Sequence, residues 1–198
     1  MKYILNAFIL AGLCFIMSTC DEISVDLVLG EEMSYTWNDV TGTEDFDDVY
    51  FVTSQDLLDL TEDLDDETRA NIQNLDIVQI DVQLLGNTAN TASSVTLSVY
   101  IKWNDVEWDD IDADINTLFS EYAADVTQIE DNFISVVDEL DATTIGRLRD
   151  KLYAAVQLTD LTGFEVMAVG TIDDGELDAD ITVKVIMDIV TTESTSGS

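Results

Sequence analysis

Five residues in the middle of the chain have the types and the spacing of ligands for a hard cation. Calcium is held by carboxylate and carbonyl oxygens, and the loop of an EF-hand supplies them from alternate positions and from a closing glutamate. The chain has this pattern at Asp110, Asp112, Asp114, Asn116 and Glu121. The spacing therefore predicts a calcium site in this segment.

The same carboxylates have a second interpretation, as the charged first turn of a helix. Ile115 stands where the calcium loop needs glycine for a sharp turn, and Thr117 stands where an aliphatic residue is usual. Acidic side chains in the first turn of a helix are favoured by the helix dipole. Calcium binding and a charged helix start both remain open for this segment.

A second group of acids surrounds Gly175 near the end of the chain. Glycine readily takes the positive φ that a tight hairpin turn requires, so the group is expected to border such a turn. Its oxygen ligands would favour Ca²⁺ over Zn²⁺ if they held a cation. The group comprises Asp173, Asp174, Glu176, Asp178 and Asp180.

The composition excludes most other catalytic chemistry. The chain has no histidine, which rules out Ser-His-Asp and Cys-His catalysis and His-ligated zinc. It has no GxGxxG motif and no phosphate-binding loop of the Walker type. Only carboxylates remain, and a glycosidase needs two of them at a defined separation, one with a raised pKa. We therefore expect no enzymatic activity and no cofactor other than Ca²⁺.

The positive charges are few and partly clustered. Three of the seven, Arg147, Arg149 and Lys151, lie within five residues. They can neutralise acidic neighbours, or they can capture an anion, although the surrounding negative field opposes the second role.

The whole chain is strongly acidic, with a formal net charge of −35. Such a field repels nucleic acid and anionic lipid, whose binding needs clustered Lys and Arg. The acids are spread over the full length, which favours solvation of the surface over one dedicated site. High acidity with few lysines is typical of proteins from salty environments, so we expect a marine or halophilic source.

The first twenty residues read as an export signal. Lys2 is followed by an almost wholly apolar run from Tyr3 to Met17, then by small polar residues. This order of charge, apolar run and small residues is typical of a secretory signal peptide, and the run is shorter than a membrane-spanning helix. We expect residues 1–19 to be a signal peptide.

The end of the signal, Met17-Ser18-Thr19-Cys20, resembles the lipobox of bacterial lipoproteins. The resemblance implies lipidation of Cys20, cleavage before it, and a cell-envelope protein held at a membrane surface, the outer membrane by preference. It departs from the usual pattern at Met17 and Thr19. Cys14 lies inside the signal, so no disulfide is expected within the mature domain.

Apolar periodicity predicts the elements of residues 20–190, expected to form one acidic domain. Alternation predicts strands at 23–29, 78–84, 95–103, 164–172 and 181–189, and a turn at Gly30-Glu31-Glu32 that leads into a further strand. The strands at 78–84 and 95–103 are expected to pair as a hairpin. The polar end, 191–198, is expected to be a disordered tail.

Two helices are predicted between these strands. Apolar residues spaced by three and four predict a long amphipathic helix over 111–140 and a second over 143–157. Strands and helices that are segregated along the chain are typical of the α+β class. We expect a mostly antiparallel sheet or sandwich with both helices packed on one face.

Three functions follow from these features. The first is a lipid-tethered, non-enzymatic interaction or structural module that binds a protein partner at a sheet edge. The second is a small-molecule or lipid-binding lipoprotein with a cavity between the sheet and the long helix. The third is a carboxylate-based hydrolase. The oligomeric state and the partner do not follow from the sequence.

Overall fold

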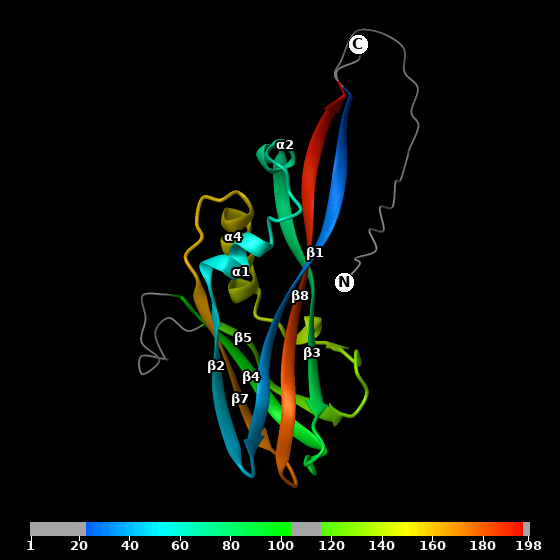
Figure 1. Cartoon of the computed structure of the whole chain (residues 1–198), viewed down its shortest axis with the longest axis vertical. Coiled ribbons are helices and arrows are strands. Elements are labelled where there is room, and N and C mark those ends of the chain that lie inside the picture. Colours follow the sequence, from blue (N-terminus) through cyan, green and yellow to red (C-terminus); the bar gives the residue numbers. More distant parts are fainter. Residues whose placement is uncertain (1–22, 104–115, 196–198) are drawn as a thin grey trace.

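The chain is built mainly from β-strands (Figure 1). The computed structural model describes residues 23–103 and 116–195. The helical elements are α1 (Ser54–Asp59), α2 (Asp66–Ala70), the 3₁₀ turn η2 (Val137–Glu139) and α4 (Ala142–Val156). The strands are β1 (Ile23–Gly42), β2 (Asp45–Val52), β3 (Ile72–Gly86), β4 (Ser94–Trp103), β5 (Asn116–Thr127), β6 (Ile134–Ser135), β7 (Phe164–Ile172) and β8 (Leu177–Thr195).

These strands form one curled sheet in the order β1-β8-β3-β5-β4-β7-β2, with β6 added to β3. The link between β3 and β5 is parallel and joins only two residue pairs, Leu84 with Val126 and Leu85 with Thr127. The other ladders are antiparallel. The sheet folds over at this short junction, so that β1, β8 and β3 face β4, β7 and β2 across the core.

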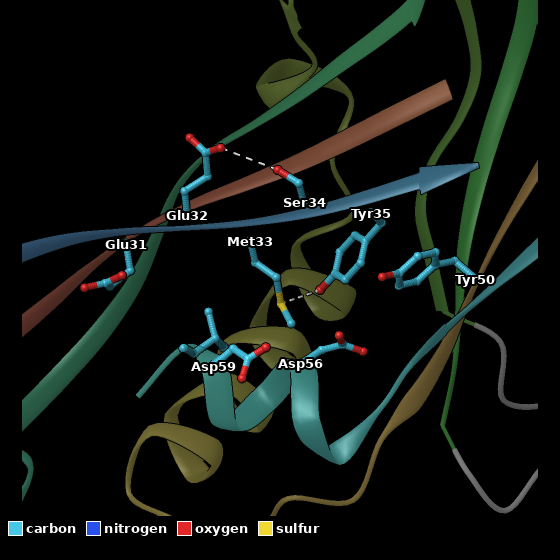
Figure 2. Close-up of a pocket in the computed structure, with 9 residues that line it drawn as sticks. Glu31, Glu32, Met33, Ser34, Tyr35, Tyr50, Asp56 and Asp59 are labelled. Atoms are coloured by element: carbon cyan, nitrogen blue, oxygen red, sulfur yellow. Dashed lines mark hydrogen bonds between the residues drawn. The ribbon is translucent and has the colours of Figure 1, made fainter. Parts of the chain in front are cut away.

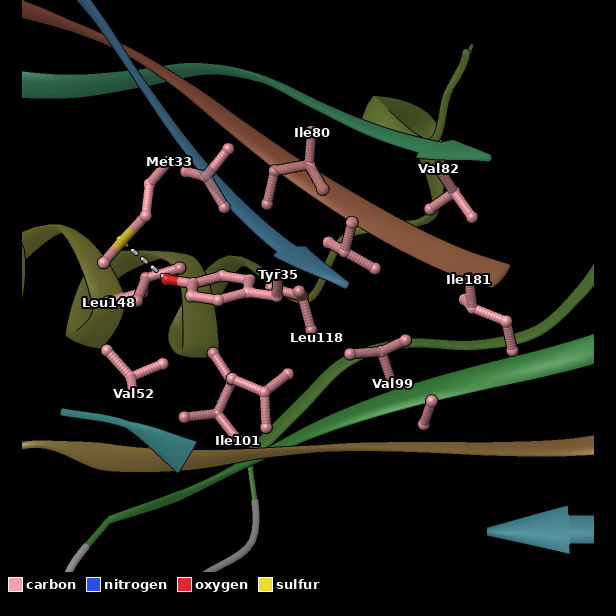
Figure 3. Close-up of a cluster of buried hydrophobic side chains, with 14 of the residues drawn as sticks. Met33, Tyr35, Val52, Ile80, Val82, Val99, Ile101, Leu118, Leu148 and Ile181 are labelled. Atoms are coloured by element: carbon pink, nitrogen blue, oxygen red, sulfur yellow. Dashed lines mark hydrogen bonds between the residues drawn. The ribbon is translucent and has the colours of Figure 1, made fainter. Parts of the chain in front are cut away.

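The core lies between these two halves (Figure 3). Strict alternation along β8 directs every second side chain inward, and Ile181, Val183 and Val185 are each 0% exposed. Contact across the core is direct, since the rings of Tyr35 on β1 and Phe164 on β7 lie 6.4 Å apart. Burial of apolar surface between the halves is the main source of stability.

The predicted helix at 143–157 is confirmed as α4. Asp141 caps its N-terminus by accepting hydrogen bonds from the Thr144 amide at 2.8 Å and the Thr144 hydroxyl at 3.0 Å. These bonds lower the pKa of Asp141. Leu148 and Leu152 lie on the buried face of the helix, which packs against β3 and β5.

The predicted α+β class with two packed helices is wrong, because the long helix over 111–140 is absent from the described residues. Residues 116–127 are strand β5, and β6 and η2 follow it. β5 contains an irregularity: Leu97 pairs with Tyr122 but Val99 pairs with Phe119, and Glu121 has a φ of 54°. An extra residue in a strand changes the apolar spacing from two to three, which imitates a helical period.

Three further expectations are corrected by the strand pairing. β3 and β4 do not form a hairpin, because β5 lies between them in the sheet. The expected turn at Gly30-Glu31-Glu32 is continuous strand within β1. The tail expected to be disordered from Thr191 is part of β8 as far as Thr195 and pairs with the start of β1.

Candidate interaction surface at the edge of β1

β1 is the edge strand of the curled sheet and, within the described residues, it pairs with β8 alone. In an antiparallel pair, every second residue of a strand points its N–H and C=O groups away from the partner strand. A strand of 20 residues therefore presents a long row of main-chain donors and acceptors along its outer side.

A hollow of about 210 Å³ adjoins this edge, between β1, α1 and the Tyr50 side chain of β2 (Figure 2). Acidic residues from two separate elements line it. Those of β1 are Glu31 and Glu32, of which Glu32 directs its carboxylate to the opposite face of the strand, and those of α1 are Asp56 and Asp59.

Alternation along β1 places Glu31 on the face that Met33 and Tyr35 also occupy, while Glu32 and Ser34 point from the opposite face (Figure 2). Glu31 is thus an acidic residue on the core-facing side of β1, in the part of the strand that faces α1 across the hollow. Partial burial raises its pKa, and the nearby carboxylate of Asp63 raises it further. A positive charge placed in the hollow would offset both effects.

α1 owes its start to a capping box. The Thr53 hydroxyl accepts a hydrogen bond from the Asp56 amide at 3.3 Å, and the Asp56 carboxylate accepts from the Thr53 amide at 2.7 Å. This reciprocal pair fixes the first turn of the helix. Asp59, three residues later on the same side, accepts from the Gln55 side-chain amide at 2.7 Å. Both carboxylates are therefore held at the rim of the hollow.

Tyr35 forms the inner wall of the hollow and is only 2% exposed. Its hydroxyl donates to the Met33 sulfur at 2.9 Å, and thioether sulfur is a weak acceptor. Burial raises its pKa far above the usual range, and Tyr50 and Asp56 add to the rise. The phenol therefore stays neutral and cannot serve as a nucleophile at ordinary pH.

Beside the hollow, β1 and β2 are in contact through aromatic side chains, since the two strands do not pair in the sheet. Tyr50 lies 5.6 Å from Tyr35 and 6.2 Å from Trp37, measured between ring centroids. Trp37 is 3% exposed, and its indole N–H meets no acceptor in the described part of the chain. A buried donor without a partner is uncommon, which marks this edge as incompletely satisfied.

The described residues that line the hollow carry several negative charges and include no Lys or Arg. On the opposite face of β1, Glu32 forms an ion pair with Lys184, in which Oε1 and Nζ lie 3.1 Å apart. The same Nζ atom lies 4.2 Å from the centre of the Phe133 ring. Among the described residues, no ion pair is found for Glu31, Asp56 or Asp59.

The residues predicted to bind calcium are only partly placed. Asp110, Asp112 and Asp114 lie outside the described residues, while Asn116 and Glu121 lie on β5. The Glu121 amide donates to the Ser98 hydroxyl at 3.0 Å, and its side chain is exposed. These two residues belong to a strand and not to a loop that leads into a helix, so they lack the EF-hand arrangement. Calcium binding by the group stays a prediction.

The second acidic group borders a tight turn, with Gly175 at a φ of 73°. The expected hairpin is wrong, because the flanking strands do not pair with each other: β7 lies between β4 and β2, and β8 lies between β1 and β3. Asp174 accepts from the Ser93 amide and hydroxyl, both at 2.9 Å, which lowers its pKa. Asp173 accepts from the Ser94 hydroxyl at 2.9 Å. These carboxylates hold the turn against Ser93 and against Ser94, the first residue of β4. Within residues 23–103 and 116–195, no three metal-ligating side chains form a cation site.

The basic cluster lies on α4 beside a second hollow, of about 470 Å³. Lys151 pairs with Asp160 at 2.7 Å, and Arg149 pairs with Asp150 at 2.8 Å. The Arg147 guanidinium lies 5.4 Å from the centre of the Trp103 ring. The pairing of Lys151 and Arg149 favours local neutralisation over anion capture.

The acidic hollow was missed at the sequence level for a specific reason. Gly30-Glu31-Glu32 has the composition of a turn, although Glu31 continues the alternation through Met33 and Tyr35. The capping-box spacing of Thr53 and Asp56 was a second available signal. Cys20, the predicted lipidation site, lies outside the described residues.

Comparison with known proteins leaves the family open. No protein-family model matches the chain, and no curated protein matches it. Among solved structures, one of Desmodium yellow mottle tymovirus has a TM-score of 0.40 at 13% identity, over 100% of this chain and 99% of that chain. A structure of turnip yellow mosaic virus has a TM-score of 0.32 at 11% identity, over 88% and 99% of the two chains. A decameric BFDV capsid protein has a TM-score of 0.32 at 7% identity, over 84% and 99%. Scores at this level support no inference about function.

No helix in the described part of the chain is long and apolar enough to cross a bilayer.

Proposed function

We propose that the chain is a lipid-anchored cell-envelope protein that acts as a non-enzymatic interaction module. The observation that carries this proposal is the position of β1. The strand begins at Ile23, three residues after Cys20, and it is also the open edge of the sheet. Anchor and interaction surface would therefore lie on one continuous stretch of chain.

The start of β1 supports this arrangement. Pairing of β3 with β8 begins at Ile72 and Thr191, so the backbone of residues 23–26 pairs only with residues 192–195. The result is a two-stranded ribbon that extends beyond the body of the molecule (Figure 1). At about 3.3 Å per residue, the ten steps from Ile23 to Met33 span roughly 33 Å. A lipid on Cys20 would hold the ribbon tip at the membrane and the hollow well above it.

The anchor can be tested directly by mass spectrometry of the mature N-terminus. We expect a chain that begins at Cys20 and carries a diacylglyceryl group, as the lipobox-like segment before Cys20 implies. Two or more acyl chains would give stable attachment to a membrane. A Cys20→Ala variant should leave the membrane fraction. Secreted protein that begins downstream of Cys20, or an intact precursor in the cytosol, would contradict the proposal.

The ligand-cavity alternative loses its main support, because it required a long helix over 111–140 and residues 116–127 are a strand. Carboxylate-based hydrolysis retains one favourable observation, the raised pKa of Glu31 near Asp56 and Asp59. Hydrolysis assays on a panel of glycans test it. We expect no turnover, and activity abolished by Glu31→Gln would establish an enzyme instead.

A further inference from the structure

We infer that the outer edge of β1 binds an extended, cationic polypeptide segment as an added strand, with its basic side chains entering the hollow beside α1. The first step is the main chain. The outward N–H and C=O groups of β1 are the recognition elements of β-strand addition, in which main-chain hydrogen bonds supply affinity and side-chain pockets supply specificity. β1 offers both along Glu31–Tyr35.

Charge selects the occupant. Glu31, Asp56 and Asp59 face the hollow without an ion pair among the described residues, so a lysine or arginine side chain complements it. A second copy of this chain is the wrong partner, because β1 paired with β1 would bring two sets of these carboxylates together in proteins of net charge −35. Like charges placed opposite each other across an interface oppose association.

Geometry selects the pattern of the segment. Side chains of an added strand alternate between the two faces of the sheet, as those of β1 do. Every second residue would lie on the Glu31 side and enter the hollow. The others would lie on the opposite face, where Val28 is 55% exposed. The fitting segment therefore alternates basic and small apolar residues.

A purely protective role for the same carboxylates makes a different prediction. Inward-pointing charges on edge strands keep sheets from pairing with other chains. If Glu31 only repels added strands, neutralising it should leave the binding of a segment with lysine at alternate positions unchanged or strengthen it. If the hollow receives cations, neutralising Glu31 should weaken that binding.

The test measures binding of short synthetic peptides to the full chain by fluorescence anisotropy. One peptide alternates lysine and valine, a second alternates glutamate and valine, and a third is the lysine peptide N-methylated at every residue, so that neither of its edges can donate a main-chain hydrogen bond. We expect the first to bind, and the other two to bind at least about tenfold more weakly. N-methylation leaves the charge intact, so equal binding of the first and third peptides would overturn strand addition.

Matched variants locate the site. Glu31→Gln with Asp59→Asn should weaken the lysine peptide roughly five- to tenfold, as expected for the loss of two partly exposed charge pairs. Glu44→Gln with Asp47→Asn removes the same charge from exposed positions at the start of the other edge strand, β2. This control should change binding by less than about twofold.

An equal loss in both double variants would show diffuse electrostatic attraction and overturn the inference, as would the absence of binding by the lysine peptide. Concentration-dependent dimers that place β1 against β1 would also overturn it. Asp56 is left unchanged because it caps α1. The measurement does not depend on lipid, so it fails or succeeds separately from the anchor at Cys20.

Discussion

Replacing Leu152 on α4 with alanine tests whether the helix is part of the core or a movable cover. Leu152 is 0% exposed and belongs to the central apolar cluster. The substitution removes three carbon groups, and at about 0.8 kcal/mol per buried CH₂ the transfer term is roughly 2.4 kcal/mol. Incomplete collapse of the space left behind adds to this, for a total of about 3–4 kcal/mol.

Urea unfolding followed by circular dichroism measures this change. With an m-value of about 2–3 kcal/mol per molar urea, the midpoint should fall by roughly 1–2 M. The melting temperature should fall by roughly 6–16 °C, since each kcal/mol is worth about 2–4 °C in a protein of this size.

Leu158→Ala is the matched control, because Leu158 follows the same helix and is 43% exposed. It should shift stability by no more than about 0.5 kcal/mol. If Leu152→Ala were as mild as the control, α4 would not be packed into the core, and a ligand space beneath it would again be a reasonable hypothesis.

Four further outcomes are expected. Gly170→Ala should lower the melting temperature, because the added Cβ would lie 2.3 Å from carbons of the Phe46 ring. Such overpacking costs about 1–3 kcal/mol of stability, and an unchanged melting temperature would contradict this packing. Folding lowers the pKa of Asp141, Asp174 and Asp160, the last to about 2, so their stabilisation is present above the ordinary carboxyl pKa and is lost as pH falls through the folded values. Urea unfolding measured at a series of pH values should therefore show the free energy of unfolding fall as the solution is acidified, and this fall should be shallower in Asp160→Asn. The raised pKa of Glu31 changes the free energy of unfolding with pH in the opposite direction. Added sodium chloride should raise the melting temperature by screening the net charge of −35, and a salt-independent value would argue against a halophilic adaptation. Calcium should raise the melting temperature if Asp110 and its neighbours bind it; a shift that EGTA does not reverse, or that magnesium reproduces, would refute a specific site.

Local periodicity in the sequence predicted several elements well. The alternation at 164–172 and 181–189 matches β7 and the centre of β8, and the apolar spacing of 143–157 matches α4. In each case one face is buried along the whole element, so the period is unbroken. β5 was predicted as a helix because its irregularity near Glu121 changes the period within one strand.

The order of the strands in the sheet could not be predicted from the sequence, for a different reason. β3 and β4 are neighbours in sequence and both alternate cleanly, yet β5 separates them in the sheet. Which strands pair depends on contacts between distant segments, and a single sequence records these only as compatible patterns. The hollow depends on the same long-range packing, since it forms only when α1 lies beside the middle of β1.

The distribution of charge separates two roles that acidic residues can play at the β1 edge. At physiological ionic strength, charges act over about 8–10 Å, so most of the 42 acidic residues are too far from the hollow to contribute to a bound state there. They set the long-range field, which speeds encounter with cationic partners at low salt and keeps copies of the chain apart. Glu31, Asp56 and Asp59 lie within reach of an inserted side chain and set the affinity once contact is made. Salt should therefore slow association strongly, whereas substitution in the hollow should mainly speed dissociation.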